Sequence, residues 1–161
     1  MKMIKIKGLA EERFSFQKSG SAAVANNVAN FTAPYASRIK AIYATFGVMG
    51  TDGTGSPTQD VIVDVKKNGT SIFSGAGKIN WAHAGQVGTA NTPSNASAYG
   101  ALTTNPTLLA KGDFVRIDIT QILNGTTPTQ PTDLTIHIVL ERTRGTSPVS
   151  AMLTGQVNEN D

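Results

Sequence analysis

The stretch that decides the fold is Val61-Ile-Val-Asp-Val-Lys-Lys-Asn-Gly-Thr-Ser-Ile-Phe73, where two apolar runs flank an Asn-Gly pair. Such a pair strongly indicates a β-hairpin, because both central residues of a type I′ turn need a positive φ. With Asn68 and Gly69 in the turn, the predicted cross-strand pairs are Lys67 with Thr70, Val65 with Ile72, and Val63 with Ser74. Four apolar side chains then share the face that we predict to be buried: Val61, Val63, Val65 and Ile72.

Further strands are predicted on both sides of the hairpin. Alternating apolar and polar residues indicate strands over residues 37–50, 78–81, 114–122 and 134–140. A hairpin is only marginally stable by itself, so these strands must pair with it and cover its apolar face. Short strands separated by turn residues, with little sign of helix, are typical of an all-β sandwich. The pattern favours a jelly-roll-like β-sandwich over an immunoglobulin-like one.

The strand predicted over residues 37–50 is apolar on both faces near its end. One of these faces can cover the core, and the other then needs a second cover, which a neighbouring subunit would provide. We therefore predict an interface between copies of the chain at Tyr43, Phe46 and Val48.

The two ends of the chain differ in composition from the middle. Residues 1–36 are interpreted as an N-terminal arm, residues 37–145 as the β-sandwich domain, and residues 146–161 as a C-terminal extension. The arm alternates apolar and polar residues, so we expect it to add a strand to an exposed sheet edge of a partner while its basic side chains meet an acidic surface. The residues predicted to make this contact are Lys2, Ile4, Lys5, Ile6, Lys7, Arg13, Phe14 and Phe16.

A long stretch of small and polar residues over 85–104 is interpreted as a surface excursion. Loops of this length tend to bind a ligand or to pack against a neighbouring subunit. In a binding loop, Trp81 and Tyr99 would form the exposed surface. We favour the alternative for Trp81, a side chain that fills the core.

Length and composition limit the classes of function. A chain of 161 residues fits one domain, and the absence of cysteine excludes disulfides and thiolate metal sites. No apolar run reaches the roughly 18 residues that span a bilayer, and the N-terminus does not resemble a signal peptide. We therefore expect no membrane partner. Outside the first twenty residues the basic residues do not cluster with interleaved aromatic ones, so we expect no direct contact with nucleic acid.

Few residues suggest catalysis. His83 and His137 are the two histidines of the chain, and without cysteine they do not complete a metal site. Asp64 and Asp118 lie in the polar phase of their strands, so they form a buried acid pair only if that face is covered. We predict no catalytic residue, no metal ligand and no cofactor, and we expect that the chain is not an enzyme.

Four segments share features with a known group of proteins: Ile39-Lys-Ala-Ile-Tyr-Ala-Thr-Phe-Gly47, Val63-Asp-Val-Lys-Lys-Asn-Gly-Thr-Ser-Ile-Phe73, Lys111-Gly-Asp-Phe-Val-Arg-Ile-Asp-Ile-Thr-Gln-Ile122 and Leu134-Thr-Ile-His-Ile-Val-Leu140. Together they resemble a β-sandwich module in structural proteins of tailed bacteriophages. The resemblance covers roughly residues 37–145. Such modules occur in capsid decoration (cement) proteins, head fibres and baseplate or tail-fibre proteins, and they are often trimers.

The resemblance implies a virion part without enzymatic activity. A short chain with one module is most similar to a capsid decoration protein, which binds and stabilises the phage head as a homotrimer. Its partner would be the major capsid protein, and it would lie on the outer surface of the capsid after synthesis in the host cytoplasm. The alternative is a receptor- or carbohydrate-binding module of a baseplate, tail fibre or head fibre, whose partner is a host-surface receptor or glycan.

Overall fold

The described part of the chain consists of β-strands and their connections. The computed structural model describes residues 11–73, 77–83 and 107–143. Their strands are β1 (Glu11–Ser21), β2 (Ala25–Thr32), β3 (Ser37–Val48), β4 (Val61–Lys67), β5 (Thr70–Ser71), β6 (Ile79–Trp81), β7 (Thr107–Leu109), β8 (Phe114–Gln121) and β9 (Thr132–Arg142). The strands predicted over 37–50, 78–81, 114–122 and 134–140 correspond to β3, β6, β8 and β9.

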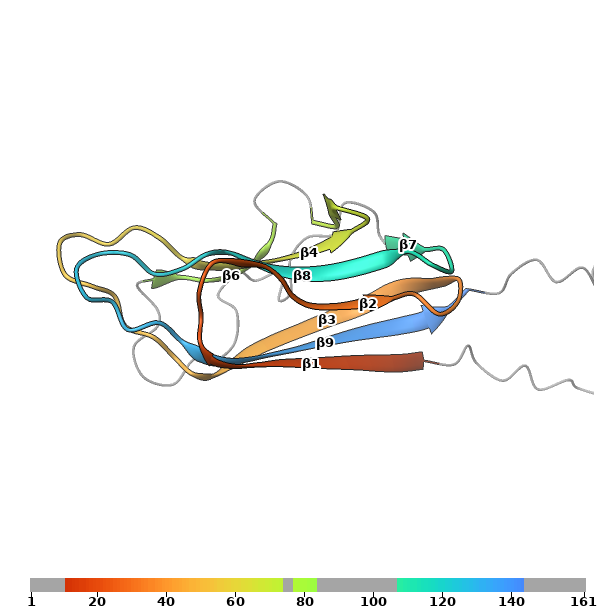
Figure 1. Cartoon of the computed structure of the whole chain (residues 1–161), viewed down its shortest axis with the longest axis horizontal. Coiled ribbons are helices and arrows are strands. Elements are labelled where there is room, and N and C mark those ends of the chain that lie inside the picture. Colours follow the sequence, from red (N-terminus) through yellow and green to blue (C-terminus); the bar gives the residue numbers. More distant parts are fainter. Residues whose placement is uncertain (1–10, 74–76, 84–106, 144–161) are drawn as a thin grey trace, which may run out of the picture.

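The strands form two antiparallel sheets that pack face to face (Figure 1). One sheet has the order β1-β9-β3-β7, and the other has the order β2-β8-β4-β5, with β6 also paired to β4. The pairs are nested along the chain: β1 with β9, β2 with β8, β3 with β7, and β4 with β5 and β6. A long antiparallel hairpin that wraps into two sheets in this way is a jelly roll, which confirms the predicted fold class.

The Asn-Gly hairpin lies at the centre of this nested pairing. Asn68 has a φ of 49° and Gly69 a φ of 89°, as a type I′ turn requires. Lys67 pairs with Thr70 as predicted, and the N–H of Ile72 donates to the carbonyl of Val65 at 3.0 Å.

The predicted register is wrong beyond Ile72. Val63 pairs with Ile79 of β6 and not with the predicted Ser74, which lies outside the described residues. This pairing places Ile79 opposite Val63 and Trp81 opposite Val61. All four side chains are buried in the core.

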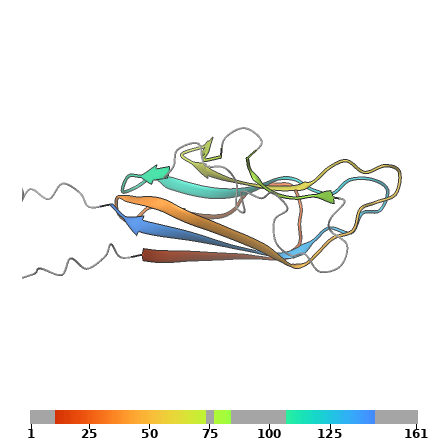
Figure 2. The ribbon, with the colours of Figure 1, turned by 180° about the vertical axis from the view of Figure 1, so that it is seen from behind.

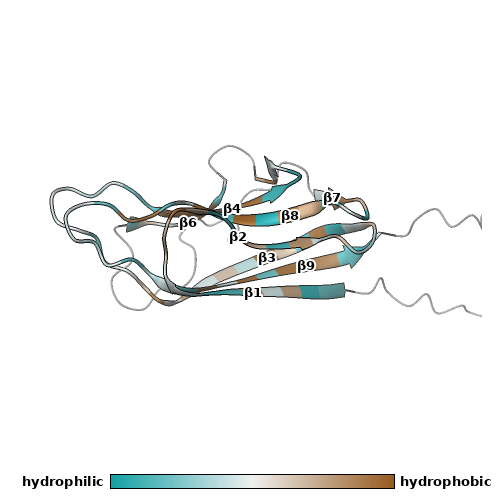
Figure 3. Cartoon of the chain, viewed as in Figure 1, coloured by the Kyte–Doolittle hydropathy of each residue, from teal (hydrophilic) through white to brown (hydrophobic). Residues whose placement is uncertain are grey.

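The core lies between the two sheets and is filled by alternate residues of their strands. The predicted hairpin face is buried, with Val61, Val63 and Val65 at 0% exposure. Phe46 of β3 meets Trp81 of β6 edge to face, with ring centroids 4.7 Å apart. Apolar and polar segments alternate along β8 and β9 (Figure 3), as expected for strands with one buried face. The largest fully buried side chains are Trp81, Phe46, Ile39, Ile79, Ile117, Ile119, Ile136, Ile138, Leu140, Val61 and Val63.

The interpretation of residues 1–36 as one arm is wrong for the residues that the structure describes. β1 pairs with β9 and β2 pairs with β8, so residues 11–32 complete the edges of both sheets. Phe14 and Phe16 stand opposite Ile138 and Ile136 and point into the sandwich, where both stack on Phe31. The sequence of this segment is too polar to identify as a sheet component, because only alternate residues of an edge strand are needed to cover the core.

The connections β3–β4 and β8–β9 extend side by side from one end of the sandwich, here called the tip (Figures 1 and 2). Isolated bridges join Thr51 to Thr129 and Thr54 to Thr126. Two glycines permit this approach: a Cβ on Gly50 would lie 2.4 Å from the carbonyl oxygen of Thr129, and one on Gly53 would lie 2.6 Å from that of Thr126. The tip is therefore a paired extension of the backbone.

Replacing Gly50 with alanine is expected to lower the free energy of unfolding by about 2 kcal/mol, because the new methyl group forces the paired loops apart. Urea unfolding followed by circular dichroism measures the change. Thr51→Ala is the matched control, since Thr51 is exposed, and it should change stability by less than about 0.5 kcal/mol. Equal effects of the two substitutions would contradict the close approach of the loops.

Candidate functional site

A charged cluster covers the outer face of the β2-β8-β4-β5 sheet. Asp64 of β4 stands directly opposite Asp118 of β8, and both are fully buried. Lys66 Nζ lies 2.8 Å from Asp118 Oδ2, and Arg116 Nε lies 3.3 Å from Oδ1. Lys78 Nζ lies 3.2 Å from Asp64 Oδ2.

Polar groups from neighbouring strands complete the cluster. The hydroxyl of Ser71 donates to Asp64 Oδ1 at 2.6 Å. The backbone N–H of Asn27 donates to Asp118 Oδ1 at 2.8 Å. Asn27 has a φ of 57° and lies where β2 bulges away from its register with β8, so this bulge brings the N–H to the carboxylate. The condition for a buried acid pair, a covered outer face, is thus met.

The electrostatics of the cluster favour a structural role. Burial by itself would raise the pKa of Asp118, but the hydrogen bond from Lys66, the N–H of Asn27 and the charges of Lys66 and Arg116 outweigh it and lower the pKa below 3.8. General acid catalysis by a carboxyl group near neutral pH needs the opposite shift. Each carboxylate has its own lysine, and the ion pairs and hydrogen bonds of the cluster together join β2, β4, β5 and β8.

The outer face of the β1-β9-β3-β7 sheet carries a second group of polar and aromatic side chains. Ser15, His137 and Tyr43 form one row across β1, β9 and β3. Ser15 Oγ and His137 Nδ1 are hydrogen-bonded at 2.7 Å. The guanidinium of Arg13 lies over the ring of Tyr43, 5.7 Å from its centroid.

A hollow of about 560 Å³ lies on this face, lined by Glu11, Glu12, Arg13, Lys40, Ala41, Tyr43 and Val139. Its polar rim is internally paired, because Lys40 forms a salt bridge with Glu11, which raises the pKa of Lys40. Four of the residues that line this hollow are charged, and the others are Ala41, Tyr43 and Val139.

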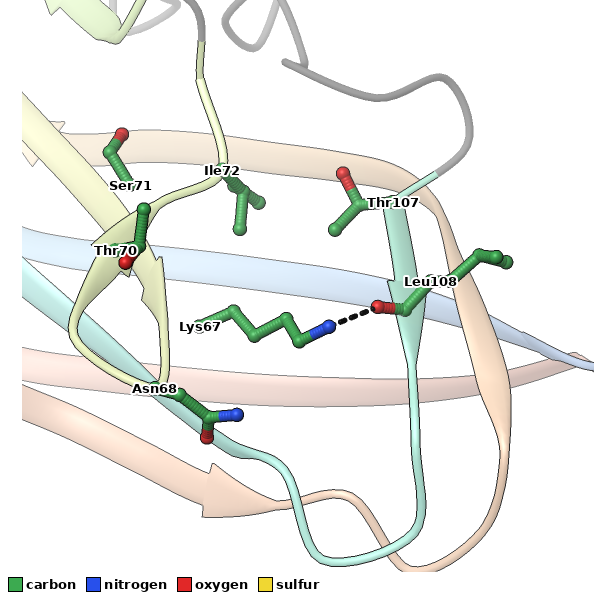
Figure 4. Close-up of a pocket in the computed structure, with 7 residues that line it drawn as sticks. All are labelled: Lys67, Asn68, Thr70, Ser71, Ile72, Thr107 and Leu108. Carbon is green, nitrogen blue, oxygen red and sulfur yellow. Dashed lines mark hydrogen bonds between the residues drawn. The ribbon is translucent and has the colours of Figure 1, made fainter.

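A further hollow of about 430 Å³ lies between the β4–β5 turn and β7 (Figure 4). Lys67 reaches across it, and its ammonium group donates to the carbonyl of Leu108 at 2.9 Å. The same ammonium group lies 3.2 Å from Asp113, whose pKa is lowered, first by the hydrogen bond from Asn68. Lys67 and Asn68 therefore fasten the central turn to both sheets.

The three residues predicted for the interface between subunits differ in their exposure. Tyr43 and Val48 are exposed, at 37% and 60%. Phe46 is buried within its own domain, so its assignment to an interface is wrong. A bulge in β3 near Lys40 shifts the alternation, and Phe46 thereby falls on the inner face.

The residues predicted for other contacts are also distributed differently. Trp81 is 1% exposed, which confirms it as a core side chain and excludes it from an exposed binding surface. Phe14 and Phe16 are engaged inside the sandwich, so their assignment to a partner-binding arm is wrong, whereas Arg13 lies on the outer face. The remaining predicted residues lie outside the described part of the chain: Lys2, Ile4, Lys5, Ile6, Lys7 and Tyr99.

Some members of the charged cluster had no signal in the sequence. The polar phase of two strands identified Asp64 and Asp118, and the same alternation could have added Lys66 and Arg116. The role of Asn27 as a backbone donor to Asp118 could not be predicted, because it depends on a bulge in β2 that no residue pattern marks.

Within residues 11–73, 77–83 and 107–143, no cluster of three or more histidine and acidic side chains is arranged to hold a metal ion. The same residues contain no helix of the length and apolarity needed to cross a membrane. Comparisons with models of protein families, with curated proteins and with solved structures gave no match.

Proposed function

We propose that this chain is a structural protein of a tailed-phage virion, one that decorates the outer surface of the head as a homotrimer and stabilises it by binding the major capsid protein. The resemblance of residues 37–145 to phage β-sandwich modules gives the class of protein. The jelly roll, with its charged groups engaged in holding strands together, suits a stable structural part without enzymatic activity.

The observation that carries the proposal is that the two ends of the sandwich differ: both terminal segments join one end, and the tip forms the other. Glu11 at the start of β1 pairs with Glu141 near the end of β9, so residues 1–10 and 144–161 both join the domain at one end. The tip lies at the opposite end (Figure 1). A protein that attaches to a surface through its extensions would then present its tip outward.

The attachment is proposed to use residues 1–10, with Ile4 and Ile6 buried against the capsid and Lys2, Lys5 and Lys7 beside acidic groups. Burial of two isoleucine side chains contributes at least about 3 kcal/mol. Exposed lysines contribute less, because their charges are screened at physiological ionic strength. The trimer contact is proposed to use Tyr43 and Val48 on and beside the outer face of β3.

Deletion of residues 1–10 is therefore expected to weaken binding to undecorated heads of the same phage at least about 100-fold. The deletion leaves β1 intact, and circular dichroism checks that the variant folds. Co-sedimentation with heads at increasing protein concentration measures the affinity, and removal of residues 150–161 is the matched control. Equal binding by the deletion variant would exclude the proposed anchor, and failure of the full chain to bind heads would exclude a decoration role.

A receptor- or glycan-binding module of a baseplate, tail fibre or head fibre is the second candidate. The tip favours it, since exposed hydroxyl groups of Thr51, Thr54, Thr126 and Thr129 lie on a paired backbone. Trp81 does not support it, because that ring is in the core. Loss of phage adsorption to host cells after tip substitutions, in particles whose heads are as stable as those of the wild type, would favour this candidate.

A further inference from the structure

The outer edge of β1 is a long strand edge without a partner among the described residues. β1 spans Glu11–Ser21 and stands at the end of the order β1-β9-β3-β7. Figures 1 and 2 show it at the margin of its sheet from both sides. The main-chain N–H and C=O groups on such an edge form a template for pairing with another strand.

The inward-facing side chains along this edge are self-complementary: opposite charges lie at equal distances on either side of a central aromatic pair. Towards the inside of the sandwich, β1 presents an acid, two phenyl rings and a base: Glu12, Phe14, Phe16 and Lys18. Phe14 and Phe16 stack on Phe31, with centroids 4.6 Å and 5.8 Å away, yet both remain half-buried. A strand added to the edge would cover the exposed part of these rings.

We propose that β1 pairs antiparallel with β1 of a second copy of this chain, about a two-fold axis through Ser15. In this register Phe14 of each copy stands opposite Phe16 of the other, and Glu12 stands opposite Lys18. A two-fold axis repeats each pair, so the contact contains two aromatic pairs and two opposite-charge pairs. The inner faces of both sheets stay on the same side, and the two sheets become one.

Other two-fold registers of β1 fit worse. An axis through Phe14 places Glu12 opposite Phe16, and an axis through Phe16 places Phe14 opposite Lys18. An axis through Arg13 places two arginines face to face, which is destabilising. With the axis at Ser15, the outward-facing pairs are Arg13 with Gln17 and Glu11 with Ser19, so no like charges meet.

The edge contact is distinct from the proposed trimer contact, because it uses the margin of the sheet and not the outer face of β3. A chain that forms the edge contact alone is a dimer, and the smallest closed assembly that contains both contacts is a hexamer. Both assemblies contain an even number of copies, whereas the trimer contact alone gives three.

Sedimentation equilibrium of the full-length protein tests the edge contact by charge reversal. In the proposed register, Glu12→Lys places two lysines opposite each other in both symmetry-related pairs, and Lys18→Glu places two glutamates there. Each substitution is therefore expected to raise the dissociation constant of the two-fold contact at least about tenfold. The double variant restores opposite charges and should return the constant to within about threefold of the original. Within one copy Glu12 contacts Tyr35 and Lys18 contacts Ser19 and Ser21, so no contact between the two residues explains such a rescue.

Lys111→Glu is the matched control, since this exposed lysine follows β7, at the other end of the sheet order from β1, and it should leave the assembly unchanged. Wild-type protein with an odd number of copies, or masses that do not respond to the reversals, would overturn the proposal. Single variants that weaken assembly without rescue by the double variant would overturn it as well, because the register would be wrong. A wild-type dimer that responds as expected would support the edge contact and contradict the trimer.

Discussion

Replacing Trp81 with alanine is expected to lower the free energy of unfolding by about 3 to 5 kcal/mol, the usual cost of removing a buried aromatic side chain. Trp81 is 1% exposed and stands opposite Val61 across the β4–β6 pair. Its loss removes the edge-to-face contact with Phe46, whose centroid lies 4.7 Å away. The cavity would lie where both sheets meet, so neither sheet can close it alone.

Urea unfolding followed by far-ultraviolet circular dichroism measures this loss. Tryptophan fluorescence cannot be used, because Trp81 is the only tryptophan of the chain. Val24→Ala is the control: Val24 is 61% exposed, and its truncation should cost less than about 0.5 kcal/mol. A Trp81→Ala protein as stable as the wild type would contradict the placement of this ring in the core.

The second large effect is expected for Asp118→Asn, which should lower the free energy of unfolding by about 3 kcal/mol at pH 7. Removing one partner of a buried ion pair leaves the other charge uncompensated. Lys66 and Arg116 both lose their carboxylate in this variant. Glu11→Gln is the control, because its ion pair with Lys40 is half exposed and should contribute less than about 1 kcal/mol.

The effect of Asp118→Asn should depend on pH in one direction. The folded protein holds the pKa of Asp118 below its ordinary value of 3.8, so on acidification the unfolded chain takes up this proton first. The stability contributed by Asp118 is complete above about pH 4 and is lost as the pH falls through the lower, folded pKa. The difference between wild type and variant should therefore shrink below about pH 4. A difference that stays constant or grows down to pH 3 would contradict the ion-pair account.

The sequence predicted those parts of the fold whose signals are local. Asn68 and Gly69 specify their turn through backbone conformation alone, and Leu134 to Leu140 specify a half-buried strand through alternation. The pairing of Val63 with Ile79 could not be predicted, because no local residue pattern shows which later segment pairs with β4 beyond the turn. Phe14 and Phe16 were assigned to an arm for a similar reason: a polar edge strand looks like a linker until its partner strand, β9, is known.

The candidate sites were also predictable only where their signals are local. Alternation identified Asp64 and Asp118 as polar-phase residues, but whether they are buried depends on Asn27 and the bulge of β2. The apolar residues on both faces of β3 predict an interface at Phe46, but the bulge near Lys40 decides which face each residue takes, and it places Phe46 in the core. Local patterns therefore predict which residues share a strand face, whereas bulges and neighbouring strands decide which face is covered.

Cryo-electron microscopy of the assembled virion tests the proposed function most directly, because it locates this chain on the particle. The proposed decoration role predicts density for the jelly roll on the outer surface of the head lattice, with the end that holds Glu11 and Arg142 toward the capsid and the tip outward. Density for this chain only at the baseplate or tail fibres, or on the inner surface of the capsid, would contradict it.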